Sequence, residues 1–254
     1  MLNEIRARIR QGYRTAPFPD KEMKMPERYL GLPIIDKKKC AGADCTKCVK
    51  SCPVSCITKT GKEVEIDLGI CIFCGDCARS CPSGTISFSR NYAMSVNNRN
   101  DLKLDGRTLK LAKALEDKSK AIFGRSLKLR EVSAGGCNAC EADTNVLNTL
   151  AWDLGRFGIQ FVASPRHADG LLITGNVTNN MLLALKKTYD AVAAPKLVIA
   201  VGACAISGGI YKGHPEIKNG VENILPIDLY IPGCPPHPAT ILDGLLRLLG
   251  RIEQ

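Results

Sequence analysis

The cysteines are the residues of this sequence whose number and spacing could do chemistry. There are thirteen in 254 residues, and nine of them lie between residues 36 and 90. Disulfides are disfavoured in a reducing compartment and an odd number of cysteines cannot pair completely, so the clustering points to metal ligation. Thiolates are ligands that zinc and iron–sulfur centres share. The spacing within each cluster therefore decides which metal we expect.

Two ferredoxin-type runs occupy the cysteine-rich stretch. Residues 71–82 read CIFCGDCARSCP and match the C-x2-C-x2-C-x3-C-P run, in which the fourth cysteine serves the other of two 4Fe–4S clusters. Residues 40–53, CAGADCTKCVKSCP, repeat the run with a first gap of four residues. The runs therefore predict two clusters with exchanged ligands. The first should take Cys40, Cys45, Cys48 and Cys81, and the second should take Cys71, Cys74, Cys77 and Cys52.

The segment between the two runs predicts a hairpin. It reads CITKTGKEVEIDLG and has its turn near residues 59–62. Its first residue, Cys56, stands four positions after Cys52, where a small apolar side chain would pack under a cluster. A buried free cysteine serves as a small hydrophobe. We expect Cys56 not to be a ligand, because three sites of four cysteines use twelve of the thirteen.

A third pair of cysteines lies in the stretch GGCNACEAD, residues 135–143. Cys137 and Cys140 have metal-ligand spacing, but two ligands do not close a tetrahedral site. The pair is a redox dithiol, part of a zinc site, or half of a site that Cys204 and Cys234 complete. The choice depends on how the fold places these distant residues.

Apolar patterning predicts alternating strands and helices after residue 121. The expected strands are 126–132, 159–162, 171–174, 196–201 and 227–232. The expected helices follow Cys140 through residue 154, cover 178–190, and close the chain as an amphipathic helix from Pro238. Continuous apolar strands alternating with helices predict a parallel, doubly wound sheet.

The cysteines of this region follow strands. Cys137 comes after the first, Cys204 after the fourth and Cys234 after the fifth. In an open parallel sheet the loops at the carboxyl ends of the strands converge on one edge, where ligands bind. The loops GACAISGG and IPGCPPHP are also rich in Gly and Pro, which suits a tightly enclosed cofactor. We therefore favour one site of four thiolates.

Charge and composition exclude several classes of protein. The formal charge of +10 falls to about +4 once three clusters with their thiolates are counted at about −2 each. This excess, without aromatic RNA-binding motifs or zinc-finger histidines, does not indicate nucleic-acid binding. No apolar run approaches a membrane span and no export signal is apparent. The basic stretch LNEIRARIRQGYR could lie on a membrane face, bind a partner or simply be solvated. The expected location is the cytoplasmic side.

Composition divides the chain into four expected parts. These are a basic N-terminal segment (1–35), a two-cluster ferredoxin domain (36–95), a linker or docking helix (96–120) and a cluster domain (121–254). A helix is expected from Thr108 to Phe123, with Gly124 as its stop, and it either docks or connects the domains in solvent.

The motifs of the C-terminal part resemble a known family. GGCNACEAD, SPRHAD, TGNVT, GACAISGGIY and IPGCPPHP resemble the small subunit of membrane-bound, energy-converting nickel–iron hydrogenases of the formate hydrogenlyase and Ech type, which are related to complex I. The N-terminal YRTAPFPDKEMKMPERYLGLPIID and the double run resemble the two-cluster ferredoxin subunit of the same complexes, here fused. The resemblance implies an α/β flavodoxin-like domain after an α+β bacterial 2[4Fe-4S] ferredoxin domain. It also implies a proximal 4Fe–4S cluster on Cys137, Cys140, Cys204 and Cys234.

The resemblance also implies a function. The chain would be an electron-transfer subunit of an oxidoreductase, carrying three 4Fe–4S clusters between a ferredoxin- or formate-linked donor and the nickel–iron site of a large subunit. Its partners would be that large subunit together with membrane-arm subunits, which would hold it at the cytoplasmic face of the membrane. No catalytic centre is expected in this chain, because the nickel-binding cysteine pairs are absent. The alternatives are a quinone- or sulfur-reducing complex and a free-standing polyferredoxin.

Three details of the resemblance concern single residues. The Cys-x-x-Cys spacing of residues 137–140 is that of hydrogenases, whereas complex I relatives have adjacent cysteines. Arg166 and His167 are expected near the proximal cluster, or Arg166 anchors its own loop. Relatives carry Glu three residues beyond the second cysteine, where this chain has Asp143 and has Glu141 directly after Cys140. A proton-transfer role for this carboxylate is therefore not assigned.

Overall fold

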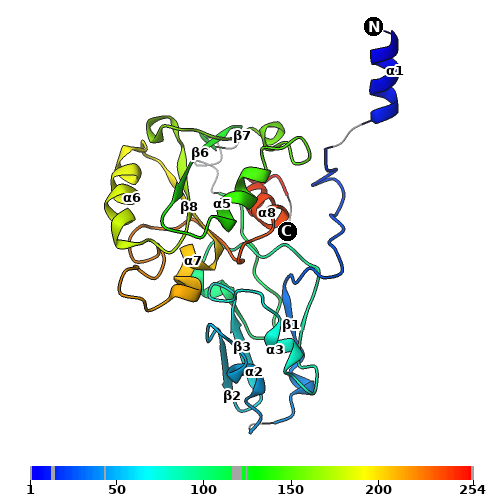
Figure 1. Cartoon of the computed structure of the whole chain (residues 1–254), viewed down its shortest axis with the longest axis vertical. Coiled ribbons are helices and arrows are strands. Elements are labelled where there is room, and N and C mark those ends of the chain that lie inside the picture. Colours follow the sequence, from blue (N-terminus) through cyan, green and yellow to red (C-terminus); the bar gives the residue numbers. More distant parts are fainter. Residues whose placement is uncertain (1, 13–14, 43, 116–121, 124, 253–254) are drawn as a thin grey trace.

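A parallel sheet forms the centre of the C-terminal part of this computed structural model, which describes residues 2–12, 15–42, 44–115, 122–123 and 125–252 (Figure 1). Its strands are β6 (Leu127–Ser133), β7 (Ile159–Phe161), β8 (Gly170–Thr174), β9 (Leu197–Val201) and β10 (Leu229–Ile231). Their order across the sheet is β10-β9-β8-β6-β7, and all four neighbouring pairs are parallel. The strands predicted from the sequence are confirmed, with ends shifted by one or two residues.

The central strands are apolar because the sheet is covered on both faces. Every residue of β8 and of β9 is buried, as expected for a parallel strand between two layers. Helix α6 (Asn179–Ala191) lies on one face, and α5 (Ala139–Val146) and α8 (Pro238–Leu248) lie on the other (Figure 1). The short helix α7 (Gly202–Ser207) follows β9 directly. Short 3-10 helices complete this part: η3 (Leu154–Phe157), η4 (Pro165–His167) and η5 (Gly209–Tyr211).

Two helices of this part differ from the sequence prediction. The helix after Cys140 ends at Val146 instead of continuing to residue 154, and turns follow it. The closing helix α8 has the predicted amphipathic sequence, but its polar side is covered as well, since every residue from Pro238 to Leu248 is buried. Its outer side is covered by chain from the other half of the sequence.

That cover comes from the N-terminal segment and the connecting segment. The Tyr29 hydroxyl lies 3.4 Å from Thr240 Oγ1 on α8. The backbone N–H of Leu115 donates to the Leu248 carbonyl, and Arg156 holds the carbonyls of Ala16 and Phe18. The segment before the cysteine-rich part is therefore packed against the C-terminal part. This packing also explains why α8 is buried along its whole length, including its Asp243–Arg247 ion pair.

The helix predicted from Thr108 to Phe123 is wrong in its first half. Residues 108–115 run without regular secondary structure, with Leu109 and Ala112 buried. A backbone hydrogen bond holds this segment instead, because the Ala112 N–H donates to the Ser95 carbonyl. Residues 116–121 and Gly124, the predicted stop, lie outside the described residues.

The cysteine-rich part consists of two small antiparallel sheets and short helices. Strand β1 (Pro33–Ile35) pairs with β4 (Ile86–Phe88), and β2 (Ile57–Thr60) pairs with β3 (Glu63–Asp67) as the predicted hairpin. The remaining elements are β5 (Lys103–Leu104), the 3-10 helices η1 (Lys37–Lys39) and η2 (Arg99–Leu102), and the one-turn helices α2 (Lys47–Lys50) and α3 (Asp76–Arg79). The two cysteine runs thus each lead into an equivalent one-turn helix.

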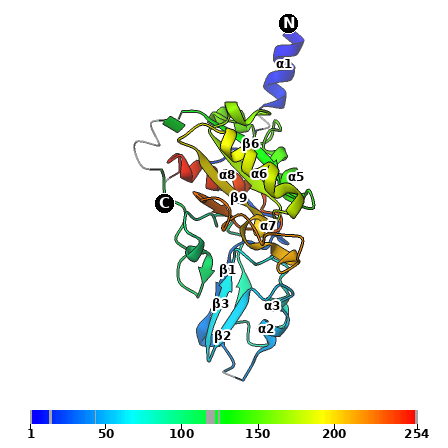
Figure 2. The same cartoon turned by 90° about the vertical axis from the view of Figure 1, so that its left-hand side faces the viewer.

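The two parts share an apolar core. One cluster of buried side chains contains Ile66 and Leu102 from the cysteine-rich part together with Ile173 and Ala200 from the sheet. Val96 also exchanges both backbone hydrogen bonds with Tyr230 of the edge strand β10. Figure 2 shows the cysteine-rich part seated beneath the α7 end of the sheet. Shared packing of this kind fixes the two parts against each other.

Helix α1 (Leu2–Gln11) stands apart from this body (Figures 1 and 2). None of its residues is buried, and Leu2, Ile5 and Ile9 are exposed. Among the described residues, no helix is both long and apolar enough to cross a membrane.

Because β8 lies in the core of the sheet, removal of a large side chain from it should strongly reduce the stability of the protein. Leu172 is completely buried, so Leu172→Ala should lower the free energy of unfolding by about 3 kcal/mol. Leu183→Ala is the matched control, because that leucine is 62% exposed on α6 and should change stability by less than about 0.5 kcal/mol. Anaerobic urea denaturation measures both. Equal effects of the two variants would contradict the assignment of β8 to the core.

Candidate metal centres

The second ferredoxin run and Cys52 gather in one place. Cys77 stands on α3, after Gly75, whose positive φ of 77° begins the turn. Burial raises the pKa of Cys77 to about 12, and the charges of Cys71, Cys74 and Cys52 contribute to this rise. The four sulfurs are therefore within electrostatic reach of one another. These are the residues that the sequence predicts for the second cluster.

Two of the four cysteines predicted for the first cluster, Cys48 and Cys81, lie near each other. Burial raises the pKa of Cys48, and the charge of Cys81 adds to this effect. Burial alone would raise the pKa of Cys81, but hydrogen bonds with Ser83 and Thr85 outweigh it and lower the pKa to about 6. Cys48 and Cys81 thus lie within electrostatic range of each other, and the exchange of the fourth cysteine between the runs stays a prediction.

Cys40 and Cys45 lie on the enlarged loop before α2. Lys59 Nζ donates to the carbonyls of Gly42 and Cys45, at 2.5 and 2.7 Å, and ties this loop to β2. Both cysteines are half-buried. Their role as ligands of the first cluster stays a prediction.

The four C-terminal cysteines converge as the strand order predicts. Cys137 follows β6, Cys140 stands on α5, Cys204 on α7 after β9, and Cys234 follows β10. Burial raises the pKa of Cys140, and the charges of Cys204, Glu141, Cys234 and Cys137 raise it further. Burial and the charges of Cys234 and Cys137 raise the pKa of Cys204 to about 11. Four sulfurs from loops spread over about a hundred residues therefore face one another.

Two glycines open the space around these sulfurs. Gly202 has φ +88°, and a Cβ placed on it would lie 2.6 Å from Cys140 Sγ. Gly209 has φ +56°, and its Cβ would lie 2.8 Å from Cys204 Sγ. Any other residue would be strained and would collide with a thiol. The loops are thus shaped around the sulfurs, which is what an enclosed metal centre requires.

Burial and the neighbouring sulfurs favour the neutral form of these thiols, so a change to thiolate ligands would need a compensating positive charge. Among the described residues, no group of three or more His, Cys, Asp or Glu side chains is arranged around a single ion. Four thiolates are a donor set that zinc ions and iron–sulfur cores share.

Cys56 contacts the second group more closely than the sequence indicates. It is buried, its Sγ lies 3.4 Å from Cys52 Sγ, and its backbone N–H donates to the same sulfur at 3.3 Å. A hydrogen bond from Cys56 lowers the pKa of Cys71. Sequence reasoning treats this residue as a small hydrophobe. Its position four residues after Cys52 was the available signal for a contact with cluster ligands.

The two carboxylates behind Cys140 have different settings. Glu141 is only 6% exposed, and its Oε1 accepts hydrogen bonds from Ser133 Oγ at 2.6 Å and Thr174 Oγ1 at 2.7 Å. It is therefore held by the ends of β6 and β8. Asp143 lines a cavity of about 200 Å³ together with Phe73 and His237, and burial raises its pKa.

Arg166 and His167 occupy η4 at the surface of the sheet domain. The His167 backbone N–H donates to the Ser164 carbonyl, which closes the turn. Their predicted hydrogen bonding near the proximal cluster stays a prediction.

A family model described as "NADH ubiquinone oxidoreductase, 20 Kd subunit" matches residues 137–248. A second model, "4Fe-4S binding domain", matches residues 64–87. The first therefore covers most of the sheet and its four cysteines, and the second covers the second ferredoxin run. Together with the thiolate groups, these matches define an iron–sulfur protein.

Three curated relatives place the chain more closely. The probable membrane-bound hydrogenase subunit mbhJ of Pyrococcus furiosus is 38% identical over 159 residues, which are 63% of this chain and 90% of the relative. An NADH-quinone oxidoreductase subunit of Phocaeicola vulgatus is 43% identical over 133 residues, 52% of this chain and 66% of the relative. Formate hydrogenlyase subunit 7 of Escherichia coli is 44% identical over 130 residues, 51% of each chain. The chain belongs to the family of the 20 kDa subunit of NADH ubiquinone oxidoreductase, and the resemblance stated from its motifs is confirmed.

The pocket behind Glu141 generates a prediction about pH. Glu131 lines a cavity of about 440 Å³ with Glu141, and its Oε1 is buried without a hydrogen-bond partner among the described residues. Burial and the charge of Glu141 raise the pKa of Glu131 to about 7. An acid whose folded pKa is raised destabilises the fold when it is charged, so the penalty is full above pH 7 and vanishes below the ordinary value of about 4.5.

Glu131→Gln should therefore stabilise the protein above pH 7 by about 1 kcal/mol, a value discounted for the partial exposure of the side chain. The difference from wild type should disappear near pH 4.5. Thermal unfolding of the reconstituted protein across this range measures it, with the exposed Glu27→Gln as control. A difference independent of pH would show that Glu131 does not titrate as described.

Proposed function

We propose that the chain is the electron-transfer subunit of a membrane-associated nickel–iron hydrogenase and that it carries three 4Fe–4S clusters. The observation that carries this proposal is the convergence of four cysteines at the carboxyl edge of the sheet, next to a double ferredoxin run in the same chain. The relatives named as formate hydrogenlyase subunit 7 and as a membrane-bound hydrogenase subunit support it. A 4Fe–4S cluster, when bound, takes up and releases one electron without making or breaking a substrate bond.

The residues of the chain would hold these clusters and tune them. The ligand sets are Cys40, Cys45, Cys48 and Cys81; Cys71, Cys74, Cys77 and Cys52; and Cys137, Cys140, Cys204 and Cys234. Backbone N–H groups of Phe73 and Thr85 donate to the sulfurs of Cys71 and Cys81, both at 3.3 Å. Such hydrogen bonds stabilise the thiolate and raise the reduction potential of a cluster.

The strand order supports the finer description of the fold. Numbered along the chain, the order is 2-1-3-4-5, which is that of flavodoxin-like sheets. We accordingly propose a flavodoxin-like domain from about residue 121, a bacterial-type ferredoxin domain over 36–95, a basic segment over 1–35 and a linker over 96–120.

The surface around the C-terminal cysteines supports a large partner subunit. Cys137 and Cys234 are exposed in the isolated chain, whereas Cys140 and Cys204 are half-buried. A cluster ligated here would be open to water on one side. A large subunit with a nickel–iron site would cover it and receive its electrons. Membrane-arm subunits would hold the assembly at the cytoplasmic face, and a ferredoxin- or formate-linked protein would supply electrons to the cysteine-rich part.

A second function is favoured by the NADH-quinone oxidoreductase relative, which is as similar as the hydrogenase relatives. In that case the chain would serve a quinone- or sulfur-reducing complex. The Cys-x-x-Cys spacing of Cys137 and Cys140 favours the hydrogenase.

Anaerobic purification of the tagged chain with its native partners distinguishes a hydrogenase from a quinone- or sulfur-reducing complex. We expect a co-purifying large subunit that contains nickel in about equimolar amount, because the large subunit must supply the hydrogen-reacting centre that this chain lacks. A large subunit without nickel in a complex that reduces quinone or sulfur would contradict the hydrogenase proposal in favour of the second function. Isolation of the chain alone, with reducible clusters, would instead indicate a free-standing carrier.

Iron content tests the three-cluster proposal. The reconstituted chain should contain about twelve iron atoms, and Cys204→Ala should contain about eight, because one ligand set is broken. Cys56→Ala is the matched control, since it removes a buried cysteine outside the three sets and should retain about twelve. Iron and sulfide assays measure all three proteins. Wild-type protein with about eight iron atoms, or loss of iron from the Cys56 variant, would contradict the assignment.

A further inference from the structure

The loop that leads from β3 to Cys71 is held by one residue, Asp67. Its carbonyl accepts the N–H groups of Ile70 and Cys71, at 3.1 and 3.0 Å. Its carboxylate accepts the N–H of Gly69 at 2.9 Å. The position of Asp67 therefore determines where the second ferredoxin run begins.

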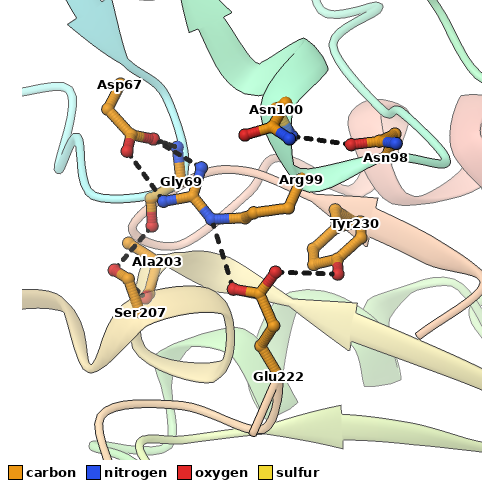
Figure 3. A network of polar contacts seen from close by, with 9 residues as sticks. All are labelled: Asp67, Gly69, Asn98, Arg99, Asn100, Ala203, Ser207, Glu222 and Tyr230. Carbon is orange, nitrogen blue, oxygen red and sulfur yellow. Dashed lines mark hydrogen bonds and ion pairs between the residues drawn. The ribbon is translucent and has the colours of Figure 1, made fainter. Parts of the chain in front are cut away.

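Asp67 is fixed in turn by a two-bond ion pair with Arg99 (Figure 3). The two guanidinium nitrogens donate to the two carboxylate oxygens at 2.8 and 2.7 Å, and both side chains are only 15% exposed. Two parallel bonds fix orientation as well as distance, which a lysine cannot do. The pair is thus a rigid joint between the Cys71 loop and η2.

The same network reaches the sheet. Arg99 Nε lies 3.8 Å from Glu222 Oε2, and the Tyr230 hydroxyl of β10 donates to Glu222 Oε1 at 3.5 Å (Figure 3). Tyr230 stands four residues before Cys234 on the strand that leads to it. Arg99 therefore connects the loop before Cys71 with the strand before Cys234.

A second contact joins the Cys71 loop to α7. Ser207 Oγ is buried and donates to the Gly69 carbonyl at 2.8 Å, from the helix that carries Cys204. A Cβ on Gly69 would lie 2.7 Å from Arg99 Cζ and 2.8 Å from Ile206 Cγ2. Only glycine allows the loop to pass between the guanidinium and α7.

The result is that the two thiolate groups are neighbours. Ser207 stands three residues after Cys204, and Gly69 stands two residues before Cys71, so the hydrogen bond between them brings the two cysteine-bearing segments together. Phe73, from the loop of the second run, lines a cavity of about 200 Å³ together with Gly233 and Pro235. The second ferredoxin group, through Cys71, thus abuts the C-terminal group.

We infer that the Asp67–Arg99–Glu222 network, with the Ser207–Gly69 bond, is a positioning device that holds the second ferredoxin cluster against the C-terminal cluster for electron transfer. The inference rests on the proposed function. What the inference adds to that function is the role of these side chains in setting the separation of the two cysteine groups. Cys71 and Cys234 would be the facing ligands of two clusters, which when bound would supply one-electron transfer with no bond or proton exchanged.

The variants that test this inference remove single contacts of the network. Arg99→Gln removes the guanidinium, and Arg99→Lys keeps its charge without the two parallel bonds. Ser207→Ala removes the side-chain bond to Gly69. Arg107→Gln is the matched control, because Arg107 pairs with Asp105 on the surface and is 86% exposed.

The measurement is the magnetic interaction between reduced clusters, followed by electron paramagnetic resonance of the full reconstituted chain after dithionite reduction. Wild type and Arg107→Gln should show the interaction. Arg99→Gln should lose it at unchanged iron content and unchanged cluster potentials, and Arg99→Lys should restore part of it. Amide exchange at residues 67–71 should rise in Arg99→Gln and not in the control.

An Arg99→Gln protein with full iron content and an unchanged interaction would overturn the inference. If this variant fails to hold its clusters, Ser207→Ala decides: a weakened interaction supports the positioning role, and an unchanged one overturns it. A wild-type chain that lacks iron at the C-terminal site would instead count against the proposed function, whatever the result at Arg99.

Discussion

Repulsion between buried thiolates is the constraint on which this structure depends. The C-terminal thiols are disfavoured as thiolates by burial and by their neighbours, and the pKa of Cys204 reaches about 11. Protein architecture can impose such a grouping only from rigid elements, because flexible loops would let the sulfurs separate. The sheet provides that rigidity: three cysteine-bearing segments leave the carboxyl ends of β6, β9 and β10. Gly202 and Gly209 have no side chains, which leaves room for the sulfurs of Cys140 and Cys204.

The same constraint explains how the two parts of the chain are joined. A relay requires that neighbouring thiolate groups stay at a fixed separation. The shared apolar core supplies most of the cohesion, but apolar packing is not directional. The ion pair between Asp67 and Arg99 is directional, and removing one partner would leave a buried charge uncompensated. Cohesion and orientation are thus supplied by different interactions.

The sequence predicts those features that depend on local pattern. The cysteine runs, the hairpin between them, and the five strands all follow from spacing and apolar runs, and strand order then brings Cys204 and Cys234 to Cys137. Features that depend on distant partners were not predictable. Nothing near Pro238–Leu248 indicates that Tyr29 and Leu115 cover its outer side, and nothing near Asp67 identifies Arg99 as its partner. The helix expected from Thr108 failed because Leu109 and Ala112 pack individually against neighbouring chain.

The complete burial of α8 has a consequence for biosynthesis. The segment around Tyr29 is made early, but the surface on which it packs is a helix near the end of the sequence. During synthesis that segment cannot reach its final packing until α8 has formed. The loops of Cys204 and Cys234 also come late in the sequence. The cysteines of both ferredoxin runs precede residue 82 and are synthesised before those of the sheet. A chaperone or assembly factor bound to the nascent chain would therefore meet the two groups of cysteines in that order.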